Sequence, residues 1–202
     1  MFKLNDFMTS ISTRGVLKAS RYIVSFSPPT YVRNVSGMIG TDTLSVRCDS
    51  VQFPGASLAT IDGPPRYGYG PNESVPYNVT MDDITCSFIV DAGSQIHKFF
   101  YTWLSSIVNI QGKGGKSLTS ANGVVPGFSA YEVGYKDSYT VDLTVSVYDS
   151  TDKKVMEAKV YRAFPKLLPS VDFNWGSTDE IVKLVVPFSY VDFEVNYFPL
   201  QN

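Results

Sequence analysis

The sequence predicts a mainly β fold with one amphipathic helix and an extended arm. Short runs of alternating aromatic and β-branched residues recur along the 202-residue chain, as in half-buried strands. One segment has apolar residues at helical spacing, and another is too rich in proline and glycine for a regular element. Residues 1–202 fit a single domain with an N-terminal extension, and this length is enough to bury a real core.

The clearest strand signal is YTVDLTVSVY at residues 139–148. Leu143 and Val145 lie on its apolar face, because side chains alternate between the two faces of a strand. The opposite, polar face carries Asp142, Thr144 and Ser146. The turn STDK then leads into KVMEAKVY (154–161), which predicts a long hairpin. Further strands are expected at 21–26, at 43–48, at 84–90 and in a C-terminal run in which Pro187 marks an edge, bulge or bend.

The amphipathic helix is expected at about residues 93–109. Its apolar stripe consists of Ile96, Phe99, Phe100, Trp103, Leu104, Ile107 and Val108. The stripe must pack on a sheet, which makes Trp103 a core residue and not an exposed stacking platform. Ser94 is placed to cap the start of the helix, and Gly112 to end its last turn.

The arm is expected at residues 53–71, in FPGASLATIDGPPRYGYGP. Four prolines and four glycines predict an exposed loop or extended arm without a regular element. Its apolar side chains are Leu58, Ile61, Tyr67 and Tyr69. Two interpretations remain open for the two tyrosines, which either anchor the arm on a neighbouring subunit or pack within the loop itself.

Composition gives little sign of nucleic-acid recognition or of a membrane span. With 17 basic and 19 acidic residues the formal net charge is −2, whereas a nucleic-acid-binding protein is usually basic. The N-terminus lacks the apolar core of a secretory signal, so we expect assembly in a cytosol and no membrane insertion. Cys48 and Cys86 lie in apolar runs without metal-ligand spacing, which predicts buried free thiols.

Catalytic chemistry has few candidate residues. His97 is the only histidine, and its position at the margin of the helical stripe predicts a packed or half-exposed side chain. The paired acids Asp82-Asp83 and Asp179-Glu180 precede strands without calcium-loop spacing. QGKGGKSL (111–118) resembles a phosphate-binding loop, but Ile110 stands where the first glycine is required. We therefore expect no enzyme activity, metal or cofactor.

Three segments, in order along the chain, resemble the tail tube proteins of contractile-tailed bacteriophages. They are VRCDSVQFPGASL (46–58), MDDITCSFIVDAGSQIHKFFYTWLSSI (81–107) and the run from Lys154 to Val195 with its turn around Trp175. This family is related to the tubes of contractile bacteriocins and type VI secretion systems. The chain differs from a minimal tube subunit in that its segments 27–42 and 53–71 look expanded.

The resemblance implies a β-sandwich or small β-barrel with one flanking helix. It also implies a structural virion protein that forms rings of six subunits, which stack into a hollow tube for DNA. The tail sheath, baseplate and tape-measure proteins would be its partners. The expanded segments leave an alternative open, in which the chain is a baseplate, tube-initiating or tube-terminating adaptor. In a tube, the polar face formed by Asp142, Thr144 and Ser146 would line the lumen, although a plain solvent-facing strand would look the same.

We predict that the loop at 111–118 binds no nucleotide, because it lacks the first glycine and the preceding strand that a phosphate-binding loop needs. Titration calorimetry with ATP and with GTP should show no heat of binding. Micromolar binding that Lys116→Ala abolishes would contradict this interpretation.

Overall fold

The computed structural model describes residues 15–33, 39–63, 68–108, 133–176 and 180–199, together with four residues near the N-terminus. The strands are β1 (Tyr22–Phe26), β2 (Cys48–Val51), β3 (Ala56–Gly63), β4 (Glu73–Met81), β5 (Ile84–Ile89), β6 (Val141–Tyr148), β7 (Lys154–Pro165), β8 (Lys183–Ser189) and β9 (Asp192–Tyr197). The helices are α2 (Thr30–Arg33), α3 (Thr41–Val46), α4 (Gln95–Ile107) and α5 (Lys136–Tyr139). The predicted mainly β fold with a flanking amphipathic helix is confirmed.

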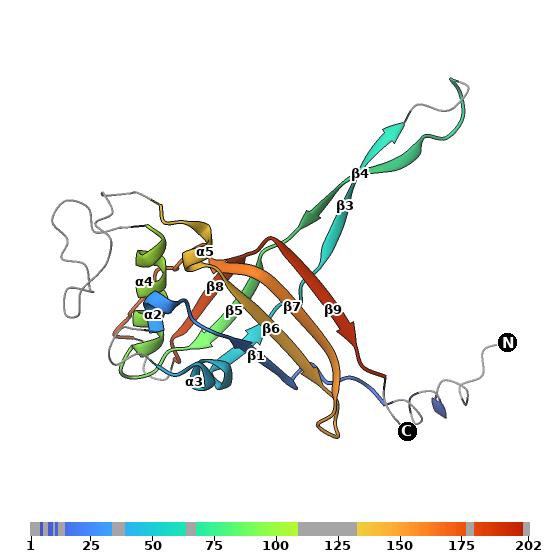
Figure 1. Ribbon diagram of the computed structural model, residues 1–202. Helices are drawn as coiled ribbons and strands as arrows, with labels where there is room; N and C mark the ends of the chain where they lie inside the picture. The colour runs from blue at the N-terminus through green and yellow to red at the C-terminus, as the bar shows by residue number, and fades with distance from the viewer. Residues whose placement is uncertain are drawn as a thin grey trace.

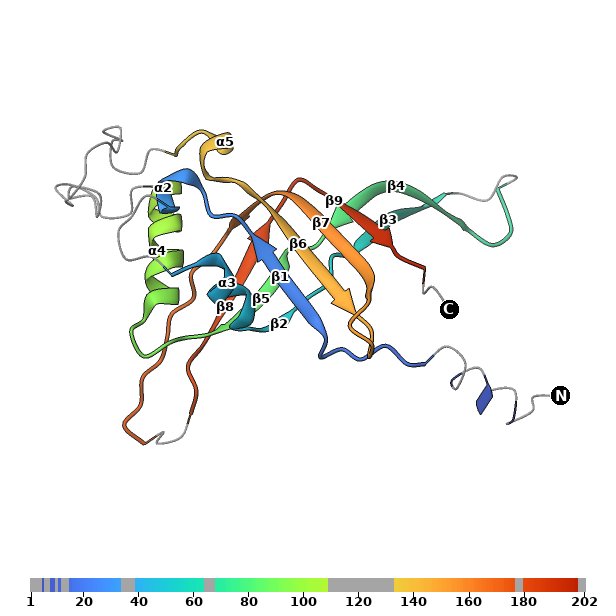
Figure 2. The same cartoon turned by 60° about the horizontal axis from the view of Figure 1, so that its bottom comes forward.

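A seven-stranded antiparallel sheet folds over to form two layers (Figures 1 and 2). Sheet 1 contains β1, β6, the first part of β7 and β9, and sheet 2 contains β2, β5, β8 and the last residues of β7. Strand β7 changes sheet at a bulge, where Arg162 has a left-handed φ of 55° and the register with β6 shifts. The sheet does not close on itself, so the fold is a sandwich and not a barrel.

Helix α4 closes one end of the core between the two sheets. Phe26 of sheet 1 and Phe188 of sheet 2 both contact Trp103, with ring centroids 5.7 and 5.9 Å from that of the tryptophan and 6.3 Å from each other. Phe88 of sheet 2 lies 5.0 Å from Phe100 on the preceding turn of the helix. The helix therefore packs against both layers through a single group of aromatic rings.

Most of the predicted apolar stripe of α4 is buried. Its buried residues are Ile96, Phe99, Phe100, Thr102, Trp103 and Ile107. The Trp103 side chain has no exposed surface, and its indole Nε1 donates a hydrogen bond to the Tyr139 carbonyl over 2.8 Å. Trp103 is therefore a core residue, as predicted.

The start of α4 differs from the prediction. Ser94 adopts a left-handed conformation with φ 52°, and its side chain makes no capping hydrogen bond. The Asp91 carboxylate caps the helix instead, because Oδ1 accepts a hydrogen bond from the Ile96 N–H over 3.1 Å. Gly112, predicted to end the helix, lies outside the described residues.

The predicted strand at 43–48 is wrong, because this segment forms helix α3 and strand β2 begins only at Cys48. Alternation would place Leu44, Val46 and Cys48 on one face of a strand. Leu44 and Cys48 are indeed buried, but Val46 is 85% exposed. The helical turn lets Leu44 alone reach the core, where α3 packs against β1.

The prediction that the arm has no regular structure is also wrong. Strands β3 and β4 form a two-stranded hairpin that includes most of 53–71 and extends ten residues further. None of the four prolines of 53–71 belongs to β3 or β4, so none of them removes a ladder hydrogen bond from these strands. Pro76 lies inside β4, opposite Thr60 at a bulge that accommodates it.

The other expected strands are found, with shifted ends. Residues 139–141 divide between α5 and β6, and β7 continues to Pro165. Pro187 lies within β8, and its carbonyl accepts a hydrogen bond from Lys166 N–H over 2.9 Å, on the side where β7 leaves the sheet. The N–H that Pro187 lacks would point to this same side, where the pairing with β7 ends, so its absence interrupts no continuing ladder.

We predict that Leu143→Asp prevents folding, whereas Thr144→Ala folds normally. Leu143 is 1% exposed between the sheets, and an unpaired buried charge costs several kcal/mol, on the order of the whole stability of a domain. Thr144 lies on the opposite, partly exposed face. Circular dichroism and urea titration distinguish the two variants, and a cooperatively unfolding Leu143→Asp protein would show that the faces are assigned incorrectly.

We also predict that Asp91→Ala lowers the free energy of unfolding by about 1 kcal/mol, because the N–H of Ile96 loses its acceptor. Ser94→Ala should change it by only a few tenths of a kcal/mol, since the hydroxyl caps nothing. Urea midpoints of the two variants check the assignment. The reverse order of stabilities would restore Ser94 as the cap.

Candidate assembly surfaces

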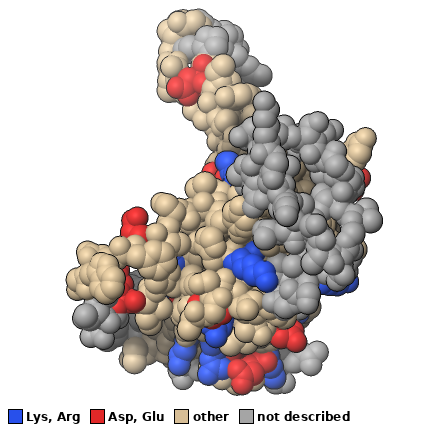
Figure 3. Space-filling view, turned by 90° about the vertical axis from the view of Figure 1, so that its left-hand side faces the viewer, with Lys and Arg blue, Asp and Glu red and all other residues tan. Residues whose placement is uncertain are grey.

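The β3–β4 hairpin stands clear of the sandwich (Figures 1 and 3). Every residue of β4 is exposed, and so are all but two of β3. Hydrogen bonds between polar side chains link the strands on the hairpin itself, from Ser74 to Asp62 and between Ser57 and Thr80, each 2.6 Å long. The hairpin is thus a projecting element that contributes little to the core.

Apolar side chains cover much of this hairpin. Leu58 is 63% exposed, Ile61 61% and Tyr69 84%, while Tyr67 lies outside the described residues. The second strand adds the exposed residues Val75, Tyr77, Val79 and Met81. Their strict alternation in ESVPYNVTM is a strand signal, but the proline within it hides the pattern. Monomeric proteins rarely expose contiguous apolar surface of this kind without a partner.

The bulge in the hairpin changes which face is apolar. Leu58 pairs with Val79 near the base, and Ile61 pairs with Val75 nearer the tip. The register shifts between Ala59 and Thr60, so the two apolar pairs lie on opposite faces. The base half and the tip half therefore present apolar surface in different directions.

The polar face of β6 belongs to a larger surface, the outer face of sheet 1. Cross-strand register extends it over four strands, through Ile23, Ser25, Asp142, Thr144, Ser146, Glu157, Lys159, Tyr161, Asp192, Glu194 and Asn196. Asp142 is exposed and Thr144 partly exposed, but Ser146 is only 6% exposed. Ser146 is therefore covered by its neighbours in the isolated subunit.

Carboxylates outnumber lysines on this outer face. Asp142, Glu157, Asp192 and Glu194 lie on it with Lys159. Glu157 also forms an ion pair with Lys154, and this hydrogen-bonded ammonium lowers the pKa of the Glu157 carboxyl. The face is acidic and hydrogen-bonded, so it offers phosphate groups little attraction.

Strand β9 forms an open edge of sheet 1. It pairs with β7 from Tyr161↔Asp192 to Met156↔Tyr197, and no other described strand pairs with it. An unpaired row of backbone N–H and C=O groups is a template for a strand of another chain. Strands β1 and β2, at the two ends of the strand order, also pair on one side only, so these edges and the hairpin are where a further strand or subunit could bind.

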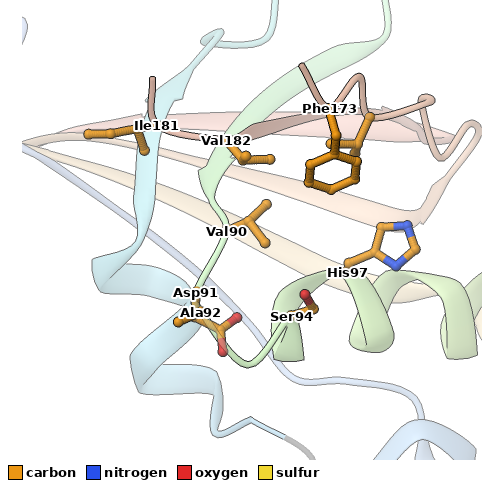
Figure 4. Close-up of a pocket in the computed structure, with 9 residues that line it drawn as sticks. Val90, Asp91, Ala92, Ser94, His97, Phe173, Ile181 and Val182 are labelled. Atoms are coloured by element: carbon orange, nitrogen blue, oxygen red, sulfur yellow. The ribbon is translucent and has the colours of Figure 1, made fainter. Parts of the chain in front are cut away.

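A pocket of about 560 Å³ opens at the start of α4 (Figure 4). It is lined by Val90, Asp91, Ala92, Ser94, His97, Val171, Phe173, Ile181 and Val182. The Asp91 carboxylate already caps the helix, and the His97 ring stacks 6.4 Å from that of Tyr101. His97 is half-buried, as predicted.

The two cysteines lie close together in the core as free thiols. Cys48 and Cys86 are free and buried, which confirms the prediction. The pKa of the Cys86 thiol is raised well above its usual value, chiefly by its hydrogen bond with the Cys48 thiol and next by its burial. The Cys86 thiol therefore stays protonated. In the described part of the chain, no group of three or more histidine, cysteine or acidic side chains is placed to hold a metal ion.

Two further sequence features concern loops and membranes. The glycine-rich segment at 111–118 lies outside the described residues. Among the residues that the structure describes, no helix has both the length and the apolar character of a membrane span.

Residues 17–196 match the family model described as phage tail tube protein. The chain belongs to the phage tail tube family. The match includes all three segments on which the resemblance rests, so that prediction is confirmed. No curated protein matches the sequence.

Solved structures of tail-tube-like proteins share this fold. The extended sheath-tube complex of an extracellular contractile injection system contains a chain with TM-score 0.56 and 16% identity, covering 94% of this chain and 97% of that one. A chain in the baseplate of the anti-feeding prophage has a TM-score of 0.59 and 8% identity, and the match covers 90% of this chain and 96% of that one. A chain in the tube-terminating cap of the anti-feeding prophage has a TM-score of 0.56 and 15% identity, and the match covers 91% of this chain and 92% of that one. At these identities the likeness establishes the tail tube fold alone.

Proposed function

We propose that this chain is the structural subunit of a phage tail tube and that it assembles into stacked hexameric rings around a channel for DNA ejection. The observation that carries this proposal is the exposed apolar hairpin on a tail tube fold. Monomeric soluble proteins rarely expose such apolar surface, so a partner subunit is expected to cover it. The subunit would be assembled in the host cytoplasm and would act in the virion tail as a scaffold without catalytic activity.

Ring closure follows from the open edge of sheet 1. When copies pair through different surfaces in a head-to-tail manner and the rotation closes, they form a ring, and edge strands that pair between copies leave no free edge. Such a ring would direct the outer face of sheet 1 either inward or outward. We place this face in the lumen, with Asp142 and Thr144 on its surface, because its carboxylates would let DNA slide without being held.

The sheath, baseplate and tape-measure proteins are the partners that such a tube needs. Support for the first two comes from the solved complexes with similar chains, one containing sheath and tube and one a six-fold symmetrised baseplate. Contact with DNA in the lumen would be transient and independent of sequence.

The alternative proposal is that the chain is a baseplate or tube-terminating adaptor. The similarity to a tube-terminating cap equals that to the sheath-tube complex, with TM-scores of 0.56 for both. Negative-stain microscopy of the purified protein separates the two functions. A tube subunit should form stacked rings, whereas an adaptor should form a single ring or none.

We predict that deleting Asp62 to Gly70 leaves the subunit folded but shortens tubes or leaves isolated subunits. The hairpin is exposed along its length, so its loss should hardly change the thermal unfolding of the core. Burial of several apolar side chains at about 25 cal/mol per Å² would contribute a few kcal/mol to assembly. Sedimentation and microscopy measure the effect.

A point variant supports the deletion experiment. Tyr69→Ser should impair assembly in the same direction, while Ser150→Ala, in the turn between β6 and β7, should not. Full-length tubes from the deletion variant would show that the arm has no role in assembly.

A further inference from the structure

Two apolar surfaces of this chain lack a partner: the tip half of the hairpin and the pocket at the start of α4. We infer that the hairpin tip of one copy docks into this pocket on the next copy, an inference that rests on the proposed tube assembly. Ile61 and Val75 form the apolar pair of the tip half, and Ile181 and Phe173 are the exposed residues at the mouth of the pocket.

The hairpin and the pocket lie at opposite ends of β5 (Figures 1 and 2). The hairpin ends at Met81, shortly before β5 begins at Ile84, and the pocket begins at Val90, directly after β5 ends. Six residues of extended strand separate the two surfaces by roughly 20 Å. A head-to-tail arrangement of identical copies needs two different surfaces at opposite ends, and this chain has them.

The length of the arm fits this arrangement. The eight residues of β3 extend roughly 26 Å, which is longer than β5. Seven of the described hairpin side chains are large, apolar and exposed. At roughly 60 Å² each they supply about 400 Å² over both faces, and Ile61 and Val75 bring about 120 Å² of this to the pocket, against the approximately 800 Å² per partner that a stable interface buries. The tip in the pocket therefore supplies one part of the interface, and the base half of the hairpin and the open strand edges supply the rest.

The pocket has the shape and chemistry to receive aliphatic side chains. Its volume of about 560 Å³ is within the range of roughly 300–1,000 Å³ that holds small ligands. The Val90 N–H donates to the Val182 carbonyl over 3.0 Å, which fixes two of its walls relative to each other. Because the Asp91 carboxylate is already bonded to the helix N-terminus, the remaining surface is mainly apolar.

The bulge in the hairpin determines which side chains dock. It places Ile61 and Val75 on the face opposite to Leu58 and Val79. The tip half therefore has an apolar face of its own, separate from the base half. We assign Ile61 and Val75 to the pocket of the neighbouring copy. Leu58 and Val79, near the base of the hairpin, are left to a different contact.

Engineered cysteines test the contact directly. Ile61→Cys together with Ile181→Cys should give disulfide-linked oligomers under mild oxidation of assembled protein, because the two side chains meet between copies. Thr60→Cys with Ile181→Cys is the matched control, since Thr60 lies on the other face of the same strand. We expect the control to link at least tenfold more slowly. The buried Cys48 and Cys86 should not take part.

A charge exchange gives an independent test. Ile61→Lys and Ile181→Glu should each fold, because both positions are more than half exposed, and each should reduce tube length. The double variant should recover assembly through the new ion pair. Equal linking of the two cysteine pairs, or normal tubes from Ile181→Glu, would overturn the docking while wild-type tubes keep the proposed function intact. Failure of the wild-type protein to assemble would instead overturn the proposed function itself.

Discussion

The aromatic contacts of helix α4 hold the two sheets of this protein together. Trp103 contacts both Phe26 of sheet 1 and Phe188 of sheet 2, and its indole N–H is satisfied by the Tyr139 carbonyl. Aromatic side chains bury large areas, and a satisfied indole avoids the cost of an unpaired buried donor. The spacing of the sheets therefore depends on this helix, and the positions of the strand edges depend on that spacing.

The bulge at Arg162 gives the open sandwich its shape. It lets β7 belong to both sheets, so that a single sheet folds into two layers without closing. An open sandwich leaves strand edges, and β9 is such an edge. The β9 edge thus lies along the same strand, β7, that joins the two layers.

The core was predictable because its periodicity is strong. Leu143 and Val145 alternate with polar residues, and the stripe of α4 follows the helical period, so both assignments needed only local sequence. Helix α3 was not predictable in this way, because among residues 42–46, whose burial is described, Leu44 is the single buried side chain. The hairpin was obscured by Pro76, which a bulge accommodates. The pocket joins residues 90–97 with residues 171, 173, 181 and 182, a proximity that only the tertiary fold creates.

The isolation of the hairpin has a kinetic consequence. A two-stranded ribbon without core contacts is only marginally stable in water, so much of its ordering free energy is spent when it meets a partner and not when the subunit folds. For an assembly that uses this arm, the first contact between two free subunits is then weak, because one arm must be ordered for little buried surface. A complete ring offers many receiving sites at once and overcomes that barrier. Growth from an existing template is thereby favoured over spontaneous nucleation.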